Sequence, residues 1–357
     1  MSSADRPNQF RAAQFTQEGG NLEIRQVQWQ NPKEGELVIR THAAGLNSTD
    51  EMIRYRLVPG VRLPETPGSN CAGEVVECGG GRSRLKEGAH VVALAMGGAL
   101  AEYVVVREEH ACELSKRQGE RHIEMCVQAF DGARIESALR RFEREQRENE
   151  HERRRREEMN ERMGMKGEGV LCVYGEGGLA RLALDILKAC KSEHGAKEER
   201  RVLVTPSSRF NAGDYGIDER DMLVIGKQNI DEELRRRGGA RLVIACDQPT
   251  DGLEETLDGM RYGSELVMLN PRKDRPLELP IANILAKDIA IRGAPWPDRR
   301  GIERALELAE KHDIRIKVAE FRFDQQQVNE AWRRMENRDS FEAPVVVFQQ
   351  QRGRAEA

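Results

Sequence analysis

The sequence lacks the marks of a secreted, metal-clustered or membrane-spanning chain. Its 357 residues contain only 7 cysteines. None of them forms a CxxC pair, and several lie in apolar runs where a thiol simply packs. No stretch approaches the roughly 20 apolar residues that span a bilayer. The polar residues 1–9 also lack the apolar core of a signal peptide. We therefore expect a reducing, cytoplasmic location and no membrane contact.

An excess of charge of one sign is missing as well. The chain has 57 basic and 61 acidic residues, for a formal net charge of -4. Such a balance gives no global footprint for nucleic acid and no acidic tail. A length of 357 residues is enough for two packed cores. Two domains of unequal size are therefore expected.

Histidine clusters are absent from the linear sequence. The 7 histidines do not have metal-ligand spacing, and most of them have charged neighbours. We expect structural or solvated roles for His42, His90, His110, His122, His151, His194 and His312.

The first third of the chain has the pattern of a β-rich domain. Between residues 10 and 112, short apolar stretches are broken by Gly, Pro and Asn. Alternation in such stretches is typical of half-buried strands. The expected strands cover residues 37–40, 73–77, 89–94 and 101–106.

From residue 169 the pattern changes to strand, glycine turn, helix and strand. Residues 170–174, 202–205, 222–225, 242–246, 265–269 and 288–292 are predicted as buried strands, with a helix over 182–190. Helical segments between buried strands predict an α/β fold with a mainly parallel sheet. The chain ends with predicted helices at 302–311 and 325–337 and strands at 316–323 and 345–348, an ending that could return to the first domain.

Residues 140–162 consist almost entirely of Arg, Glu, Asn and Gln, including four consecutive arginines, Arg153, Arg154, Arg155 and Arg156. Mixed charges at i,i+4 spacing favour an exposed helix. The absence of an apolar stripe argues against a coiled coil. A solvated helix or a disordered insertion is the main interpretation. A contact with a partner or with RNA through the four arginines is the alternative.

The clearest local motif is VLCVY at residues 170–174, followed by GEGGLA at 175–180 and an apolar helix. A strand that runs through glycines into a helix lets backbone amides approach a pyrophosphate. Gly175, Gly177, Gly178 and Leu179 are therefore candidate dinucleotide contacts, with Ala180 in place of the third glycine. An ordinary strand-to-helix turn would have the same pattern, and the carboxylate of Glu176 would repel a phosphate unless it points to solvent.

The second strand of the motif ends in Thr205 and Pro206, followed by Ser207, Ser208 and Arg209. No Asp or Glu is available there for a ribose 2′-hydroxyl, whereas hydroxyls and a guanidinium suit a 2′-phosphate. The segment therefore predicts NADPH rather than NADH, unless these residues only cap the next helix. Cys246 and Leu269, at the ends of two later strands, complete the predicted cofactor site.

Five segments in the order of this sequence carry a family resemblance: AAGLNSTD at 43–50, PGSNCAGEVV at 67–76, KEGAHVVA at 86–93, GGALAEYV at 97–104 and ANILAKDIAIRG at 282–293. Together with the glycine turn, they resemble the zinc-independent quinone oxidoreductase and alcohol-dehydrogenase-like branch of the medium-chain dehydrogenase/reductase superfamily. The resemblance implies a GroES-like, mostly β substrate domain at 1–135, completed by 298–357, and a Rossmann doubly wound parallel sheet at 165–297. The charged insertion then covers 136–164, and homodimers are common among such relatives.

The same resemblance implies hydride transfer from NADPH to a small enone, quinone or carbonyl substrate. Zinc-dependent relatives carry Cys where this chain has Asn47, and His-Glu where it has Ser69 and Asn70, so no zinc is expected. Asn47 is the first candidate donor to the developing oxygen anion, with Thr49 or Ser69 in support and Asp50 positioning the loop. Asn47 could instead be a turn residue that only fixes the loop. The alternative function is a non-catalytic scaffold that acts through the charged insertion.

Overall fold

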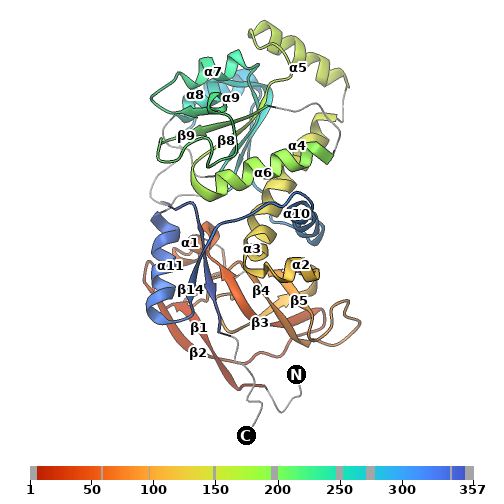
Figure 1. Cartoon of the computed structure of the whole chain (residues 1–357), viewed down its shortest axis with the longest axis vertical. Helices are drawn as coiled ribbons and strands as arrows, with labels where there is room; N and C mark the ends of the chain where they lie inside the picture. Colours follow the sequence, from red (N-terminus) through yellow and green to blue (C-terminus); the bar gives the residue numbers. More distant parts are fainter. Residues whose placement is uncertain are drawn as a thin grey trace. The chain divides into compact units, whose positions relative to one another are not determined.

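The computed structural model describes residues 6–349 except 58, 96, 148–149, 194–199, 247–251, 271–277 and 338–339. The chain divides into two compact units (Figure 1). Unit 1 comprises Met1–Asp131, Asp298–Glu310 and Arg315–Ala357, and unit 2 comprises Gly132–Pro297 with Lys311–Ile314.

Unit 1 is built on a seven-stranded sheet with the order β14-β15-β3-β4-β5-β7, in which β6 also pairs with β3. A separate hairpin joins β1 and β2 in antiparallel register. The strands of this unit are β1 (Gln9–Phe15), β2 (Leu22–Gln28), β3 (Glu36–Gly45), β4 (Asn70–Cys78), β5 (His90–Leu94), β6 (Tyr103–Arg107), β7 (Ala111–Glu113), β14 (Val318–Arg322) and β15 (Ala343–Val347).

The end of the chain joins the amino-terminal sheet. Strand β15 pairs antiparallel with β3 and parallel with β14. The helices of unit 1 are α1 (Ser48–Arg54), α2 (Lys116–Gly119), α3 (His122–Val127), α10 (Arg299–Lys311) and α11 (Gln325–Asn337), with a single helical turn η2 (Glu108–His110). The core gathers Phe15, Ile39, Leu100 and Trp332, which are at most 2% exposed.

Unit 2 is a six-stranded, wholly parallel sheet with the order β10-β9-β8-β11-β12-β13. In chain order this is 3-2-1-4-5-6, the doubly wound order of dinucleotide-binding folds. The strands are β8 (Val170–Tyr174), β9 (Arg201–Thr205), β10 (Met222–Val224), β11 (Ala240–Ala245), β12 (Met260–Met268) and β13 (Ala290–Gly293). The fold class predicted from the sequence is confirmed.

Helices cover both faces of the sheet in unit 2. Figure 1 shows α7, α8 and α9 gathered on one side of the strands and α4 and α6 on the other. The helices are α4 (Ala133–Arg147), α5 (Glu150–Arg162), α6 (Gly177–Glu193), α7 (Ile230–Arg236), α8 (Leu253–Asp258) and α9 (Ile281–Lys287), with a short 3-10 helix η4 (Glu219–Asp221). A π-helical turn, η3 (Gln128–Gly132), crosses the boundary between the two units in sequence. Strands buried on both faces need continuous apolar side chains, and all five residues of β8 are buried.

The charged segment forms two helices with different surroundings. In α4, Ile135, Ala138, Leu139 and Phe142 are buried. They recur at i, i+3, i+4 and i+7, the spacing of a core-facing stripe. This stripe starts ahead of residue 140, so the composition of 140–162 did not indicate it. Helix α5, in contrast, is exposed along most of its length.

Candidate active site

The glycine turn lies at the centre of the parallel sheet. It follows β8, between β9 on one side and β11 on the other, where the strand order reverses. Gly175 and Gly177 have φ angles of 137° and 77°, values that glycine adopts without strain. The amide of Gly175 donates to the carbonyl of Val204 at 2.9 Å. Ala180 is fully buried, so the small residue in the third position keeps the helix close to its strand.

The first turn of α6 presents amide groups that have no acceptor within the helix. The amide of Gly177 donates to the hydroxyl oxygen of Tyr215 at 3.0 Å. Burial raises the pKa of Tyr215 to about 12, so this hydroxyl stays neutral. Gly178 and Leu179 are half-exposed, and their amides have no partner in the described part of the chain. Two adjacent amides at a helix N-terminus fit a diphosphate.

The end of β9 is tied to the glycine turn by a side-chain hydrogen bond. The hydroxyl of Ser207 donates to Oε2 of Glu176 at 2.5 Å. Ser208 and Arg209 are exposed. The Glu176 carboxylate therefore does not point to solvent alone, because it lies against the serine predicted to bind a 2′-phosphate.

Cys246 and Leu269 are fully buried at the ends of β11 and β12. Their amides donate to the carbonyls of Tyr174 and Ala245, each at 2.9 Å. The carbonyl of Leu269 accepts a hydrogen bond from the buried guanidinium of Arg134. Arg134 was not among the sequence candidates for this site. Any cofactor contact at Leu269 would share that carbonyl with Arg134.

The predicted substrate residues of unit 1 form the N-terminus of α1. Asn47 is the N-cap, and its Oδ1 accepts from the amide of Thr49 at 2.9 Å. The backbone N–H of Asn47 donates to Oδ2 of Asp50 at 3.0 Å, which completes a capping box. Nδ2 of Asn47 donates to Oδ1 of Asn70 at 3.0 Å. Both ends of the Asn47 side chain therefore have structural partners.

Asp50 is completely buried and accepts three hydrogen bonds. Besides Asn47, the donors to Oδ1 are the amide of Gly68 at 2.7 Å and the hydroxyl of Ser69 at 3.1 Å. Burial raises the pKa of Asp50 to about 6, and the three hydrogen bonds oppose that rise. Ser69 is itself buried, so Asp50 and Ser69 hold the loop together. Of the four candidates, Thr49 alone is a half-exposed residue whose hydroxyl has no partner in the described residues.

The positions of the zinc ligands in metal-dependent relatives are occupied by an amide network. Nδ2 of Asn70 donates to the carbonyl of Cys126 at 2.8 Å and lies 3.3 Å from its Sγ. Burial raises the pKa of the Cys126 thiol to about 12, so it stays protonated at neutral pH. Neutral amides and a protonated thiol are poor zinc ligands. Among the described residues, no group of three His, Cys, Asp or Glu is arranged to hold a metal ion.

Three histidines that are far apart in sequence lie together in unit 1. The His42 ring lies 5.9 Å from that of His90 and 6.1 Å from that of His122. Burial, assisted by the charges of His122 and Arg40, lowers the pKa of His42 to about 4. The sequence did not indicate this cluster. His42 in β3 and His90 at the start of β5 come together because both strands pair with β4, and no local sequence pattern indicates this.

Within the described residues, no helix is long and apolar enough to cross a membrane. Residues 33–116 match the family model of the alcohol dehydrogenase GroES-like domain. Over 106 residues the chain is 39% identical to a chloroplastic quinone-oxidoreductase homolog of Spinacia oleracea, an alignment covering 27% of this chain and 32% of the relative. The chain thus spans about a third of the length of the first curated relatives that it matches.

Two further comparisons extend along nearly the whole chain. An acryloyl-coenzyme A reductase of Metallosphaera sedula is 25% identical over 315 residues, which cover 83% of this chain and 88% of the relative. The solved quinone oxidoreductase of Pseudomonas syringae superposes with a TM-score of 0.72 at 17% identity, covering 95% of this chain and 99% of that one. At this identity the superposition shows the fold alone. The GroES-like segment, the doubly wound sheet and these similarities together support the medium-chain dehydrogenase/reductase superfamily, in its quinone-oxidoreductase-like branch.

Proposed function

We propose that this protein is a nicotinamide-dinucleotide-dependent oxidoreductase that transfers hydride to a small enone, quinone or carbonyl substrate. The observation that carries the proposal is the pair of open amides of Gly178 and Leu179, at the reversal point of the 3-2-1-4-5-6 sheet. Ligands bind at this point in open α/β sheets, and a helix N-terminus there favours a diphosphate. The names of the relatives from Spinacia oleracea and Metallosphaera sedula support the reaction class.

We propose NADPH as the preferred cofactor. The exposed Ser208 and Arg209 would take its 2′-phosphate, because a guanidinium pairs strongly with phosphate oxygens. Glu176 opposes this preference, since its carboxylate lies on Ser207. The cofactor supplies the hydride when it is bound. The role of this chain's residues is to bind the diphosphate, orient the substrate and stabilise charge on the substrate oxygen.

Thr49 is the proposed donor to the substrate oxygen. The side chains of Asn47 and Ser69 are hydrogen-bonded to Asn70 and Asp50, whereas Thr49 is half-exposed and its hydroxyl has no partner in the described residues. A positioned neutral donor stabilises a developing oxyanion without the need for a metal. The hydrogen-bonded amides of Asn47 and Asn70 are poor zinc ligands, and they therefore support a zinc-independent reaction.

The proposal is tested by titrating the full chain with NADPH and NADH while following nicotinamide fluorescence, and then adding enones, quinones and aldehydes. We expect binding and oxidation of NADPH. Thr49→Val should lower kcat by about 100-fold, as loss of a single oxyanion donor does, while Thr49→Ser retains turnover and both variants keep cofactor affinity. Failure of both cofactors to bind would refute the enzyme and favour the non-catalytic alternative.

A homodimer is a further part of this proposal. Strand β13 is one of the two outer strands of the sheet in unit 2, and it includes the apolar pair Ala290 and Ile291. An unpaired strand edge can pair with a second copy of the chain. Analytical ultracentrifugation of the full chain tests this assembly, and a monomer at micromolar concentration would refute it.

A further inference from the structure

A cavity in unit 2 lies under helix α5, at the opposite edge of the sheet from the glycine turn. Its volume is about 480 Å³. Among the residues that line it from the sheet, Arg241, Arg261 and Tyr262 lie near the starts of β11 and β12, whereas the glycine turn follows the end of β8. Because all strands of the sheet are parallel, starts and ends lie on opposite edges. The cavity is therefore separate from the predicted cofactor site.

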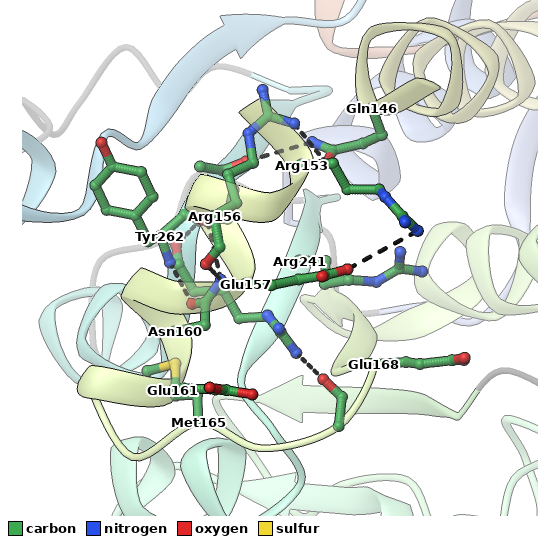
Figure 2. Close-up of a pocket in the computed structure, with 14 residues that line it drawn as sticks. Gln146, Arg153, Arg156, Glu157, Asn160, Glu161, Met165, Glu168, Arg241 and Tyr262 are labelled. Atoms are coloured by element: carbon green, nitrogen blue, oxygen red, sulfur yellow. Dashed lines mark hydrogen bonds and ion pairs between the residues drawn. The ribbon is translucent and has the colours of Figure 1, made fainter. Parts of the chain in front are cut away.

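Polar contacts hold α5 over this cavity, although the helix has few apolar residues. The amide of Tyr262 donates to Oδ1 of Asn160 at 2.8 Å. Nδ2 of Asn160 donates to the carbonyl of Arg156 at 2.8 Å, and the guanidinium of Arg156 donates to Oε1 of Gln146 at 2.7 Å. Figure 2 shows Arg156 reaching toward Gln146 and Asn160 lying beside Tyr262. The charged segment thus forms one wall of a cavity.

Three glycines make room for the arginines of the cavity. Gly169, Gly239 and Gly263 all have positive φ angles, between 72° and 81°. A Cβ at Gly169 would lie 2.9 Å from Arg261 and 3.0 Å from Arg241, one at Gly239 would lie 2.7 Å from Arg261, and one at Gly263 would lie 2.8 Å from Arg156. The backbone at these three glycines therefore leaves room for the aliphatic parts of the arginine side chains.

Positive charge lies deep in the cavity, and negative charge lies at its rim. Arg261 is only 7% exposed, and its guanidinium donates to the carbonyls of Gly167 and Gly238. Burial lowers the pKa of both Arg241 and Arg261. For Arg241 the charge of Arg261 adds to this effect, whereas the charges of Glu168 and Glu143 oppose it, and Glu157 opposes it for Arg261. The acidic residues that line the cavity, Glu157, Glu161 and Glu168, are all exposed. An anion near Arg241 and Arg261 would relieve the repulsion between their two guanidinium groups.

We propose that this cavity binds a phosphorylated small molecule of the sugar phosphate or mononucleotide class. The phosphate would lie between Arg156 and Arg241, because guanidinium groups bind phosphate oxygens in pairs. The sugar hydroxyls would donate to the rim carboxylates, which accept hydrogen bonds only. A cavity of about 480 Å³ falls in the size range of small-molecule sites. The proposal does not depend on the proposed oxidoreductase activity.

The test is isothermal titration calorimetry of the full chain with ribose 5-phosphate, with ribose and inorganic phosphate as comparison ligands. We expect ribose 5-phosphate to bind, ribose to give no heat, and inorganic phosphate to bind at least about tenfold more weakly than the sugar phosphate, a difference of about 1.4 kcal/mol. Equal binding of inorganic phosphate would overturn the sugar phosphate class, and no binding of ribose 5-phosphate would overturn the site.

Matched variants on α5 separate this cavity from the glycine turn. Arg156→Gln should weaken ribose 5-phosphate binding about tenfold or more, as loss of a charged hydrogen-bond donor does. Arg155→Gln, on the exposed face of the same helix, should leave it unchanged. Arg153→Gln should also weaken binding and serves if Arg156→Gln fails to fold. Competition by NADPH, with equal binding in the α5 variants, would assign the ligand to the glycine turn and overturn the proposal.

Discussion

Replacing Glu176 by Gln should raise the affinity for NADPH about tenfold and leave the affinity for NADH nearly unchanged. In the structure the Ser207 hydroxyl donates to the Glu176 carboxylate at 2.5 Å. A phosphate oxygen that accepted from the same hydroxyl would lie about 2.7 Å from it. The carboxylate and the phosphate would then be at most about 5 Å apart. The serine also has a single proton to donate, so the two acceptors compete for it.

The size of the effect follows from this separation. At about 5 Å, a pair of unit charges repels by about 3 kcal/mol at an effective dielectric constant of 20 and by about 1 kcal/mol in water. Glu176 is half-exposed, so the lower end applies. About 1.4 kcal/mol corresponds to a factor of ten in Kd. NADH has a hydroxyl instead of the 2′-phosphate and escapes this repulsion.

The assay is a fluorescence titration of both cofactors against Glu176→Gln and against Glu232→Gln. The second variant makes the same charge change at an exposed position in α7 of the same unit. The NADPH gain should shrink as salt is raised, because screening weakens the repulsion in the parent protein. Equal changes in affinity for NADPH and NADH, or the same gain in Glu232→Gln, would refute the idea that Glu176 repels the 2′-phosphate.

Three further substitutions test the loop and the buried groups of unit 1. The pKa of Asp50 in the folded protein is about 6, against an ordinary 3.8, so the stability that this group contributes is complete below pH 3.8 and is lost as the pH rises to about 6. Asp50→Asn should remove this pH dependence, a change of about 2–3 kcal/mol in the free energy of unfolding, as measured by urea unfolding between pH 4 and 7. The pH dependence expected from His42 has the opposite sign. Its pKa is lowered to about 4, so stability is lost as the pH falls from 6.5 to 4. His42→Phe should show a smaller loss of unfolding free energy over that range in the same assay. Asn47→Ala should lower the unfolding free energy by about 1 kcal/mol through loss of the N-cap, with a Tm decrease of about 2–4 °C in calorimetry, and an unchanged Tm would exclude the capping role.

Much of the sheet in unit 2 could be predicted because its strands are buried on both faces. Such strands are short apolar runs between turn residues, and β8 occupies the predicted residues 170–174. Helix α11 likewise covers the predicted 325–337, since its apolar residues recur at helical spacing. The capping box of α1 is also a local signal, because Asn47 and Asp50 are three residues apart.

The contacts that define the candidate sites could not be predicted in the same way. The hydrogen bond between Tyr215 and Gly177 joins residues 38 positions apart, and it depends on how the segment after β9 folds back. The histidine cluster and the arginine cavity likewise bring together side chains from several elements. In each case the partners are set by strand order and packing, which no local pattern in the sequence encodes.

The pairing of β15 with β3 has a consequence for biosynthesis. Residues 345–347 pair with residues 43–45, so the seven-stranded sheet of unit 1 lacks β14 and β15 until residue 347 has been translated. The six strands of unit 2 all lie between residues 170 and 293 and emerge earlier. While unit 2 is being made, unit 1 therefore has an open strand edge of the kind that chaperones shield.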